Sequence, residues 1–285
     1  MTSLLDVIAA GITVYDLGRP LQTGMPSSAN HPGFRMTLLR RHGDMVRADG
    51  SSAANELIIT GGHVGTHMDA LAHVSYRGML HGGVPVAEAM EHGRFTTHGA
   101  ETLPATLTRG VLLDIARAHG TDQLPAGYGI GPDDLALAAT HTGVEIRAGD
   151  VVLIRSGWGR LWPDAQAYLG LETGVPGPTE EAANWLVERG VRVTGGDTIA
   201  YEQITREVGH GLLPVHRRLL VEEGIPIIEI LDLEGISAAG VHEFCMVLAP
   251  LKVVGGTGAP IRPLAVVDAA PSGGGGGRDG GGGDG

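Results

Sequence analysis

Four potential metal ligands lie close together near the start of the chain, in the stretch HVGTHMDALAH. A single histidine in a globular chain is most simply a surface or core residue. Three histidines and an aspartate in one short stretch favour a metal site instead, because imidazole and carboxylate groups bind divalent metals. A chain with such a site must fold so that these side chains turn toward one point. They are His63, His67, Asp69 and His73.

The backbone of this cluster is predicted to be a loop that leaves the end of a strand. The run ELIIT at 56–60 is typical of a strand, and two glycines follow it. A glycine and a β-branched residue also separate His63 from His67, which disfavours the helix on which these two would share a face. A turn at Gly65 folds His63 back toward His67. Asp69 projects in the same direction as His67 if the chain is extended there.

The residue types in the cluster indicate metal-assisted chemistry. Two imidazoles and one carboxylate suit Zn²⁺, Mn²⁺ or Fe²⁺. Three protein ligands leave room for a water molecule, whose pKa a metal ion lowers to about 7. His73 is a further titratable group close by and could act as a general acid or base. We therefore predict that His63, His67 and Asp69 bind a divalent metal and that His73 transfers protons.

His216 and Glu229 form a second candidate pair. His216 lies early in a predicted helix at 212–223, and Glu229 lies on a predicted strand whose neighbours on the same face are apolar. A carboxylate on such a face is costly to bury unless something pairs with it. Two explanations stay open at this point. The partner is either a metal ion or a buried salt bridge to Arg217 or Arg218.

The acidic composition argues against nucleic-acid and membrane partners. The formal net charge is −12 and lysines and arginines form no run, so a phosphate backbone would repel the chain. No stretch of about 18 apolar residues could span a membrane. The N-terminal MTSLLDVIAAG lacks the basic region of a signal peptide. Only 18% of the residues are charged, which favours an oligomer that buries part of the surface.

The single cysteine, Cys245, cannot form an internal disulfide and is compatible with a reducing cytoplasm. It lies in the apolar run FCMVLAPL, so we expect it to be buried rather than catalytic. The cysteine content thus favours a cytoplasmic location. Together with the low charge content and the candidate metal site, it leads us to expect a protein that binds a small-molecule substrate and forms a homo-oligomer.

Residues 1–270 are predicted to form one globular domain, and residues 271–285, a glycine-rich segment, a disordered tail. Strand-like runs mixed with helical patterns indicate the α/β class. Long irregular stretches between them argue against a plain doubly wound sheet, and the glycine-rich stretches match neither a dinucleotide-binding nor a P-loop pattern. The predicted strands lie at 56–60, 111–115, 151–154, 191–194, 226–231 and 245–254, and the predicted helices at 133–141, 180–189 and 212–223.

The stretch from His63 to His73 resembles the signature of the cyclase family of metal-dependent hydrolases, His-x-Gly-Thr-His-x-Asp-x-x-x-His, at every fixed position. Further stretches are similar, among them VYDLGRPL, GDVVLIRSGWG and LPVHRRLL, so that the resemblance covers roughly residues 12–268. It implies a single domain of the swivelling β/β/α type with a mixed sheet. It also implies a homodimer or a higher oligomer.

The same resemblance implies roles for the candidate site residues. His63, His67 and Asp69 would bind a first metal ion, and Asp69 would share a second with His216. Glu229 would reach both ions, and His73 would be the catalytic acid and base. Family members hold Zn²⁺ or Mn²⁺, so the implied cofactor is one of these two metals.

The sequence departs from the kynurenine formamidases of this family in several places. Leu71 stands where those enzymes carry proline, and the N-terminal loop GMPSSANHPGF lacks their tryptophan. These differences argue against kynurenine as the substrate. The segment GGDTIAYE, which contains Asp197, Tyr201 and Glu202, also differs, and its residues line the pocket or serve the structure. Among the tryptophans, Trp158 is the best candidate to touch a substrate.

The leading interpretation is hydrolysis of a carbon–nitrogen or carbon–oxygen bond in a small cyclic amide, formamide or lactone. Metal-activated water would attack, with His73 as acid and base. Two alternatives stay open. One is cyclisation or dehydration of a polyketide-like substrate, with the same metal as a Lewis acid. The other is a non-catalytic metal- or ligand-binding protein, which a closed four-ligand site would favour.

Overall fold

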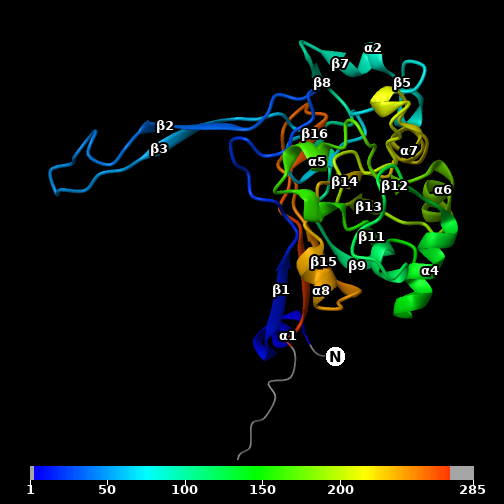
Figure 1. Cartoon of the computed structure of the whole chain (residues 1–285). Coiled ribbons are helices and arrows are strands. Elements are labelled where there is room, and N and C mark those ends of the chain that lie inside the picture. Colours follow the sequence, from blue (N-terminus) through cyan, green and yellow to red (C-terminus); the bar gives the residue numbers. More distant parts are fainter. Residues whose placement is uncertain (1–2, 270–285) are drawn as a thin grey trace, which may run out of the picture.

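A nine-stranded mixed sheet runs through the computed structural model, which describes residues 3–269 (Figure 1). The neighbouring strands β9, β11, β13 and β14 are parallel, and the strands on both sides of them are antiparallel. This arrangement confirms the predicted α/β class with a mixed sheet. In spatial order the strands are β1 (Ile12–Asp16), β17 (Leu264–Asp268), β15 (Glu243–Leu248), β9 (Thr106–Asp114), β11 (Val151–Arg155), β13 (Val193–Gly196), β14 (Ile227–Glu229), β4 (His67–Asp69) and β16 (Gly258–Pro260).

One face of the parallel strands is covered by helices. These are α3 (Ile115–Ala118), α4 (Pro132–Thr142), α6 (Glu180–Glu188) and α7 (Pro214–His216), which continues as the π-helix η5 (Arg217–Glu223). Their apolar side chains form a core with those of the strands, for example Leu135 and Leu186 against Val152. Thr179 caps α6, and Gly224 ends η5 in a left-handed conformation.

The opposite face of the sheet curls around a second core. Side chains from both ends of the strand order meet there, such as Met68 of β4, Leu153 of β11 and Met246 of β15. The short helix α8 (Glu234–Ala238) contributes Ile236 to the same core. The sheet thus has an apolar core on each face. The candidate ligands His67 and Asp69 lie on β4, close to one end of the strand order.

All six predicted strands are present, with shifted bounds. The run predicted at 245–254 ends early, at Leu248, because Pro250 follows and a proline cannot donate to a strand ladder. The three predicted helices are present as α4, α6 and the pair α7 and η5. The two outermost strands on each side of the sheet were not predicted, since they are short and lack a strong pattern of their own. They are β1 and β17 on one side and β16 and β4 on the other.

Small elements fill the connections. The helices are α1 (Leu4–Ala10), α2 (Val86–Ala89), α5 (Ala165–Leu169) and the 3₁₀ turns η1 (His81–Gly83), η2 (Ala100–Thr102), η3 (Trp158–Leu161) and η4 (Gly209–Gly211). The strand pairs are β5 (Met79–Leu80) with β6 (Val84–Pro85), β7 (Met90–Glu91) with β8 (Arg94–Phe95), and β10 (Gly129–Ile130) with β12 (Gly177–Pro178).

A hairpin stands away from the body of the molecule. Its strands are β2 (Arg35–Arg40) and β3 (Asn55–Ile59), and Figure 1 shows the pair projecting far to one side. The strand predicted at 56–60 is therefore real but lies in this arm rather than in the central sheet. The predicted tail at 271–285 falls outside the described residues. Within residues 3–269, the helices are too short or too polar to cross a membrane.

Candidate metal centre

Strand β4 carries two of the predicted ligands into the sheet. His67 and Asp69 alternate with Met68, so both point to one face while Met68 enters the second core. The loop predicted for this segment is thus a strand from His67 onward. The turn before it is as predicted, because Gly65 has a φ of 69°.

Glu229 reaches the cluster because of the register between β14 and β4. The register pairs Glu229 with His67, and their side chains lie 3.5 Å apart from Oε2 to Nε2. Glu229 Oε1 also lies 3.1 Å from His216 Nε2. Arg217 and Arg218 instead pair with glutamates of α6 and η5. A salt bridge from Glu229 to either arginine, one of the two explanations left open by the sequence, is therefore wrong.

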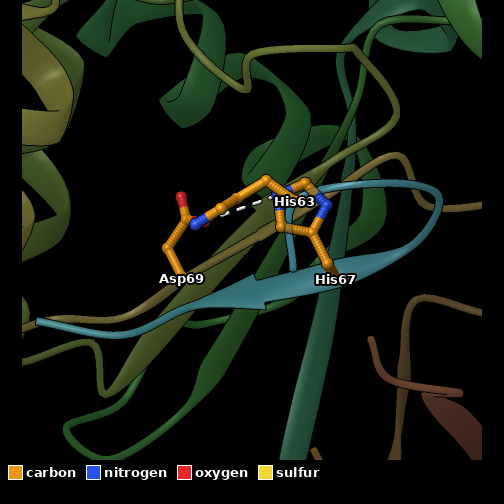
Figure 2. Close-up of side chains that lie close together, drawn as sticks. All are labelled: His63, His67 and Asp69. Carbon is orange, nitrogen blue, oxygen red and sulfur yellow. Dashed lines mark hydrogen bonds and ion pairs between the residues drawn. The ribbon is translucent and has the colours of Figure 1, made fainter. Parts of the chain in front are cut away.

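His63 folds back from the turn onto Asp69. Its Nδ1 lies 2.7 Å from Asp69 Oδ1, and its Nε2 lies 2.8 Å from the hydroxyl of Thr257. Figure 2 shows His63, His67 and Asp69 gathered at one point beside β4. The neighbouring backbone is packed against the ring, since a Cβ added to Gly258 would come within 2.5 Å of His63 Cε1. The ring is therefore held in one orientation from two sides.

His216 completes the cluster from the first turn of α7. Its Nε2 lies 3.6 Å from Asp69 Oδ2, and its Nδ1 lies 2.6 Å from Glu202 Oε1. Glu202 is buried and also accepts hydrogen bonds from the backbone N–H groups of Val215 and His216. Metal-ligating histidines commonly have such a carboxylate behind them, which fixes the ring and raises its basicity. Glu202 thus orients His216 toward Asp69 and Glu229.

His73 lies beside these ligands. Its ring stacks on that of His63, with centroids 3.9 Å apart. Burial, together with the neighbouring imidazoles, lowers the pKa of His73 to about 3, although Asp69 acts in the opposite direction. The ring is therefore neutral at neutral pH. Its role in proton transfer stays a prediction.

Two groups of side chains have ligand atoms close enough for one ion each. Within each group these atoms lie within 4.8 Å of one another. Asp69 belongs to both groups, as expected for a carboxylate between two ions. The first group is His63, His67 and Asp69, and the second is Asp69, His73 and His216.

The charges of the cluster depend strongly on one another. Burial opposes ionisation of Asp69, but the four surrounding imidazoles outweigh it and hold the pKa of this carboxyl well below its usual value. For His67 and His216, burial acts to lower the pKa, but the adjacent carboxylates have the larger effect. The net result is a raised pKa for both imidazoles. Protons on these two imidazoles would therefore compete with a cation for the cluster.

Two buried polar atoms provide a test of whether the residues suit a metal ion. His67 Nε2 and Asp69 Oδ2 have no hydrogen-bond partner within residues 3–269. His67 uses its other nitrogen for the carbonyl of Gly65, at 2.8 Å, so Nε2 is turned into the cluster. Buried polar atoms without partners are rare in folded proteins. A divalent cation would satisfy both atoms at once, and the donor set of imidazoles and carboxylates suits it.

Sequence reasoning missed two residues near the centre. They are Thr257, which faces His63, and His31, whose ring lies 5.2 Å from that of His63. Glu202 was named in the sequence, but without its role of supporting His216. Burial lowers the pKa of His31, and His63 and His67 act in the same direction. His31 was visible in the loop GMPSSANHPGF, but no sequence pattern links that loop to the cluster.

Other residues singled out in the sequence serve packing. The carboxylate of Asp197 accepts hydrogen bonds from the backbone of Ser156 and Gly157, and the hydroxyl of Tyr201 lies 2.7 Å from that of Thr194. The indole of Trp158 is buried and donates to the carbonyl of Tyr168. These are structural roles, so the expectation that Trp158 touches substrate gains no support. Cys245, expected to be buried, is half-buried.

The fold and the cluster together define a class: a mixed α/β domain that could hold a divalent metal on histidine and carboxylate side chains. Comparison of sequences gives the family. The profile of the family described as "Putative cyclase" matches residues 15–203, so the chain belongs to this family. The resemblance seen in the sequence is thus confirmed.

Individual relatives agree with this assignment. The chain is 27% identical over 231 residues to an isatin hydrolase of Roseibium aggregatum, covering 78% of each chain. Among solved structures, one described as a novel cyclase superposes with a TM-score of 0.81 at 28% identity, covering 92% of this chain and 93% of its own. Isatin hydrolase A from Ralstonia solanacearum superposes with a TM-score of 0.71 at 25% identity, covering 94% and 98%.

Proposed function

We propose that this protein is a metal-dependent hydrolase that opens an amide or lactone bond in a small cyclic substrate, or cleaves a small formamide. The observation that carries the proposal is the pair of orphaned atoms, His67 Nε2 and Asp69 Oδ2, inside a buried cluster of histidines and carboxylates. Similarity to isatin hydrolases supports the reaction class.

Zn²⁺ or Mn²⁺ is the proposed cofactor. Both metals accept imidazole and carboxylate ligands, and the two groups of ligand atoms have no sulfur among them. His63, His67 and Asp69 would hold one ion, and Asp69 with His216 a second, with Glu229 within reach of both. Such an ion supplies Lewis acidity toward a carbonyl oxygen and a lowered pKa for water.

His73 is the proposed proton-transfer residue. Its ring stacks on that of His63 beside the ligands, and the neutral ring has a nitrogen lone pair that can accept a proton from an attacking water molecule. Its position against His63 keeps it beside the ligands. The same ring can then donate that proton to the leaving nitrogen or oxygen.

The test is a set of hydrolysis assays on the purified protein. Metal is removed with a chelator and restored as Zn²⁺ or Mn²⁺, and each form is given a panel of small cyclic amides, formamides and lactones, with isatin among them. We expect hydrolysis that depends on the restored metal and is lost in the chelated protein. Hydrolysis at the same rate without metal would contradict the proposal.

Isotope labelling separates hydrolysis from cyclisation or dehydration. In ¹⁸O-labelled water, only hydrolysis places the label in the product acid. A product without label would favour the cyclase reaction that the family description names. Metal binding without turnover of any compound in the panel would favour a binding protein instead.

A further inference from the structure

Two histidines of the candidate metal centre have partners that can only accept hydrogen bonds. Nδ1 of His67 lies 2.8 Å from the carbonyl oxygen of Gly65, and Nδ1 of His216 lies 2.6 Å from a carboxylate oxygen of Glu202. A carbonyl and a carboxylate offer lone pairs and no proton. Nδ1 of each ring must therefore carry the hydrogen, which leaves Nε2 as the nitrogen that can bind a metal ion.

His63 differs from these two because its partner is a hydroxyl. Its Nε2 lies 2.8 Å from Oγ1 of Thr257, and its Nδ1 lies 2.7 Å from Oδ1 of Asp69. A hydroxyl can both donate and accept a hydrogen bond, whereas a carboxylate only accepts. Thr257 therefore suits either neutral form of the His63 ring, with its hydrogen on Nδ1 or on Nε2.

The nitrogen of His63 that faces the cluster is Nδ1. Asp69 Oδ1, which lies 2.7 Å from this atom, also lies 3.4 Å from His67 Nε2. Figure 2 shows the two rings and the carboxylate gathered beside β4. An ion bound to Asp69 Oδ1 would therefore meet Nδ1 of His63 but Nε2 of His67. The two rings would use different nitrogens, and Nε2 of His63 would stay with Thr257.

The backbone holds Thr257 against the His63 ring. The carbonyl of Thr257 accepts a hydrogen bond from the N–H of Ala70 at 2.9 Å, next to the pairing of β16 with β4. A Cβ on Gly258 would lie 2.5 Å from Cε1 of His63, and a Cβ on Gly62 would lie 2.7 Å from the carbonyl oxygen of Gly258. The His63 side chain is 8% exposed, so little water can reach it to replace the hydroxyl.

We propose that Thr257 is a positioning residue that makes Nδ1 the ligating atom of His63. With hydrogen on Nδ1, the ring donates to Asp69 and accepts from the Thr257 hydroxyl. With an ion on Nδ1, the hydrogen is on Nε2 and is donated to Thr257, so the hydroxyl changes from donor to acceptor. One proton leaves Nδ1 for water and one from water is taken up at Nε2, so the ring stays neutral. The inference rests on the proposed metal centre and adds the residue that decides how His63 binds.

The first test is the Zn²⁺ affinity of the whole chain, measured by titration against a chelator of known affinity. Thr257→Val keeps the side-chain volume but leaves Nε2 of His63 without a partner. We expect the ion held by His63, His67 and Asp69 to bind about 10- to 100-fold more weakly, as is typical when the partner of a ligating histidine is lost. Thr257→Ser, which keeps the hydroxyl, should bind nearly as tightly as wild type.

The matched control is Thr108→Val. Thr108 is also half-buried, but it lies on β9, and its hydroxyl is 3.5 Å from the carbonyl oxygen of Gly149. We expect this variant to keep the wild-type Zn²⁺ affinity. A general effect of replacing a threonine hydroxyl by a methyl group would weaken binding in both variants.

The second test is ¹H–¹⁵N correlation NMR of the histidine side chains in the Zn²⁺-loaded protein, which shows which ring nitrogen carries hydrogen. In wild type, we expect the hydrogen on Nε2 of His63 and on Nδ1 of His67 and His216. In Thr257→Val, the Nε2–H signal of His63 should be lost, while His216 keeps its pattern because Glu202 is unchanged.

Two results would overturn the inference. They are hydrogen on Nδ1 of His63 in Zn²⁺-loaded wild type, and equal Zn²⁺ affinity in wild type and Thr257→Val. If Thr257→Val does not fold, the wild-type spectrum alone decides. Neither result affects the proposed hydrolase, because metal-dependent turnover is measured separately. A wild type that binds no Zn²⁺ would instead contradict both proposals.

Discussion

His73 is the residue whose role separates catalysis from simple metal binding. Its ring packs on His63 and is neutral at neutral pH, because its pKa is lowered to about 3. We expect His73→Ala to keep its metal and to lose about 10²- to 10⁴-fold in kcat. The measurement is metal content beside the steady-state rate. Loss of one equivalent of metal would show instead that His73 is a ligand in the group with Asp69 and His216.

Glu202 acts through His216. Its carboxylate lies 2.6 Å from His216 Nδ1 and fixes the ring. We expect Glu202→Gln to weaken metal binding about 10- to 100-fold, as is typical when the carboxylate behind a ligating histidine is lost. The matched control is Glu207→Gln, an exposed glutamate of the same segment. Equal metal affinity in the two variants would contradict this positioning role.

At the scale of single elements, the turn before β4 sets the position of two ligands. Gly65 has a φ of 69°, and a Cβ there would come within 2.4 Å of Leu21 Cδ2. Gly65→Ala should therefore destabilise the fold by roughly 1–3 kcal/mol and weaken metal binding. Gly78→Ala is the control, because it has a φ of 76° and no atom within 4 Å of its Cβ. Similar denaturation midpoints for the two variants would show that the clash with Leu21 is relieved cheaply.

The same scale shows what a sequence can predict. The helix at 180–188 and the strand at 151–155 were predictable, because caps and apolar runs are local signals. The cluster on β4 was predictable because its ligands are neighbours in sequence. The pairing of β4 with β14, which brings Glu229 to His67, joins segments far apart, and nothing local encodes that register. The roles of His216 and Glu229 came from the wider resemblance to the cyclase family.

Glu202 and the hairpin of β2 and β3 also depend on the fold in ways that the sequence could not show. In the sequence, Glu202 was one of several polar residues in its segment. The structure distinguishes its role from that of Asp197, because Glu202 contacts His216 whereas Asp197 accepts hydrogen bonds from the backbone. Of the hairpin of β2 and β3, only an ordinary strand at 56–60 was predicted. Its sequence is that of a strand covered on both faces, but the sequence alone could not show that the body of the same chain leaves both faces exposed.

At the scale of the whole molecule, metal binding is coupled to pH. Burial acts to lower the pKa of His67 and of His216, but the nearby carboxylates outweigh burial. Both pKa values are therefore raised above that of an ordinary imidazole in the protein without metal. A metal ion must displace these protons. Its affinity should therefore be weakest at low pH, rise as the pH passes the raised pKa values, and level off above them. Calorimetric titration at several pH values checks this, and an affinity that stays constant from pH 6 to 8 would contradict it.

The account depends most on His67. This residue lies in the sheet with its Nε2 turned into the cluster and without a hydrogen-bond partner within residues 3–269. The most direct test is elemental analysis of wild type and His67→Ala after incubation with Zn²⁺ or Mn²⁺ and gel filtration. His92→Ala is the control, because this histidine is exposed and far from the cluster in sequence. We predict at least one bound ion per chain in wild type and His92→Ala, and a loss of bound metal in His67→Ala. Wild type without metal, or His67→Ala with the full amount, would contradict the account.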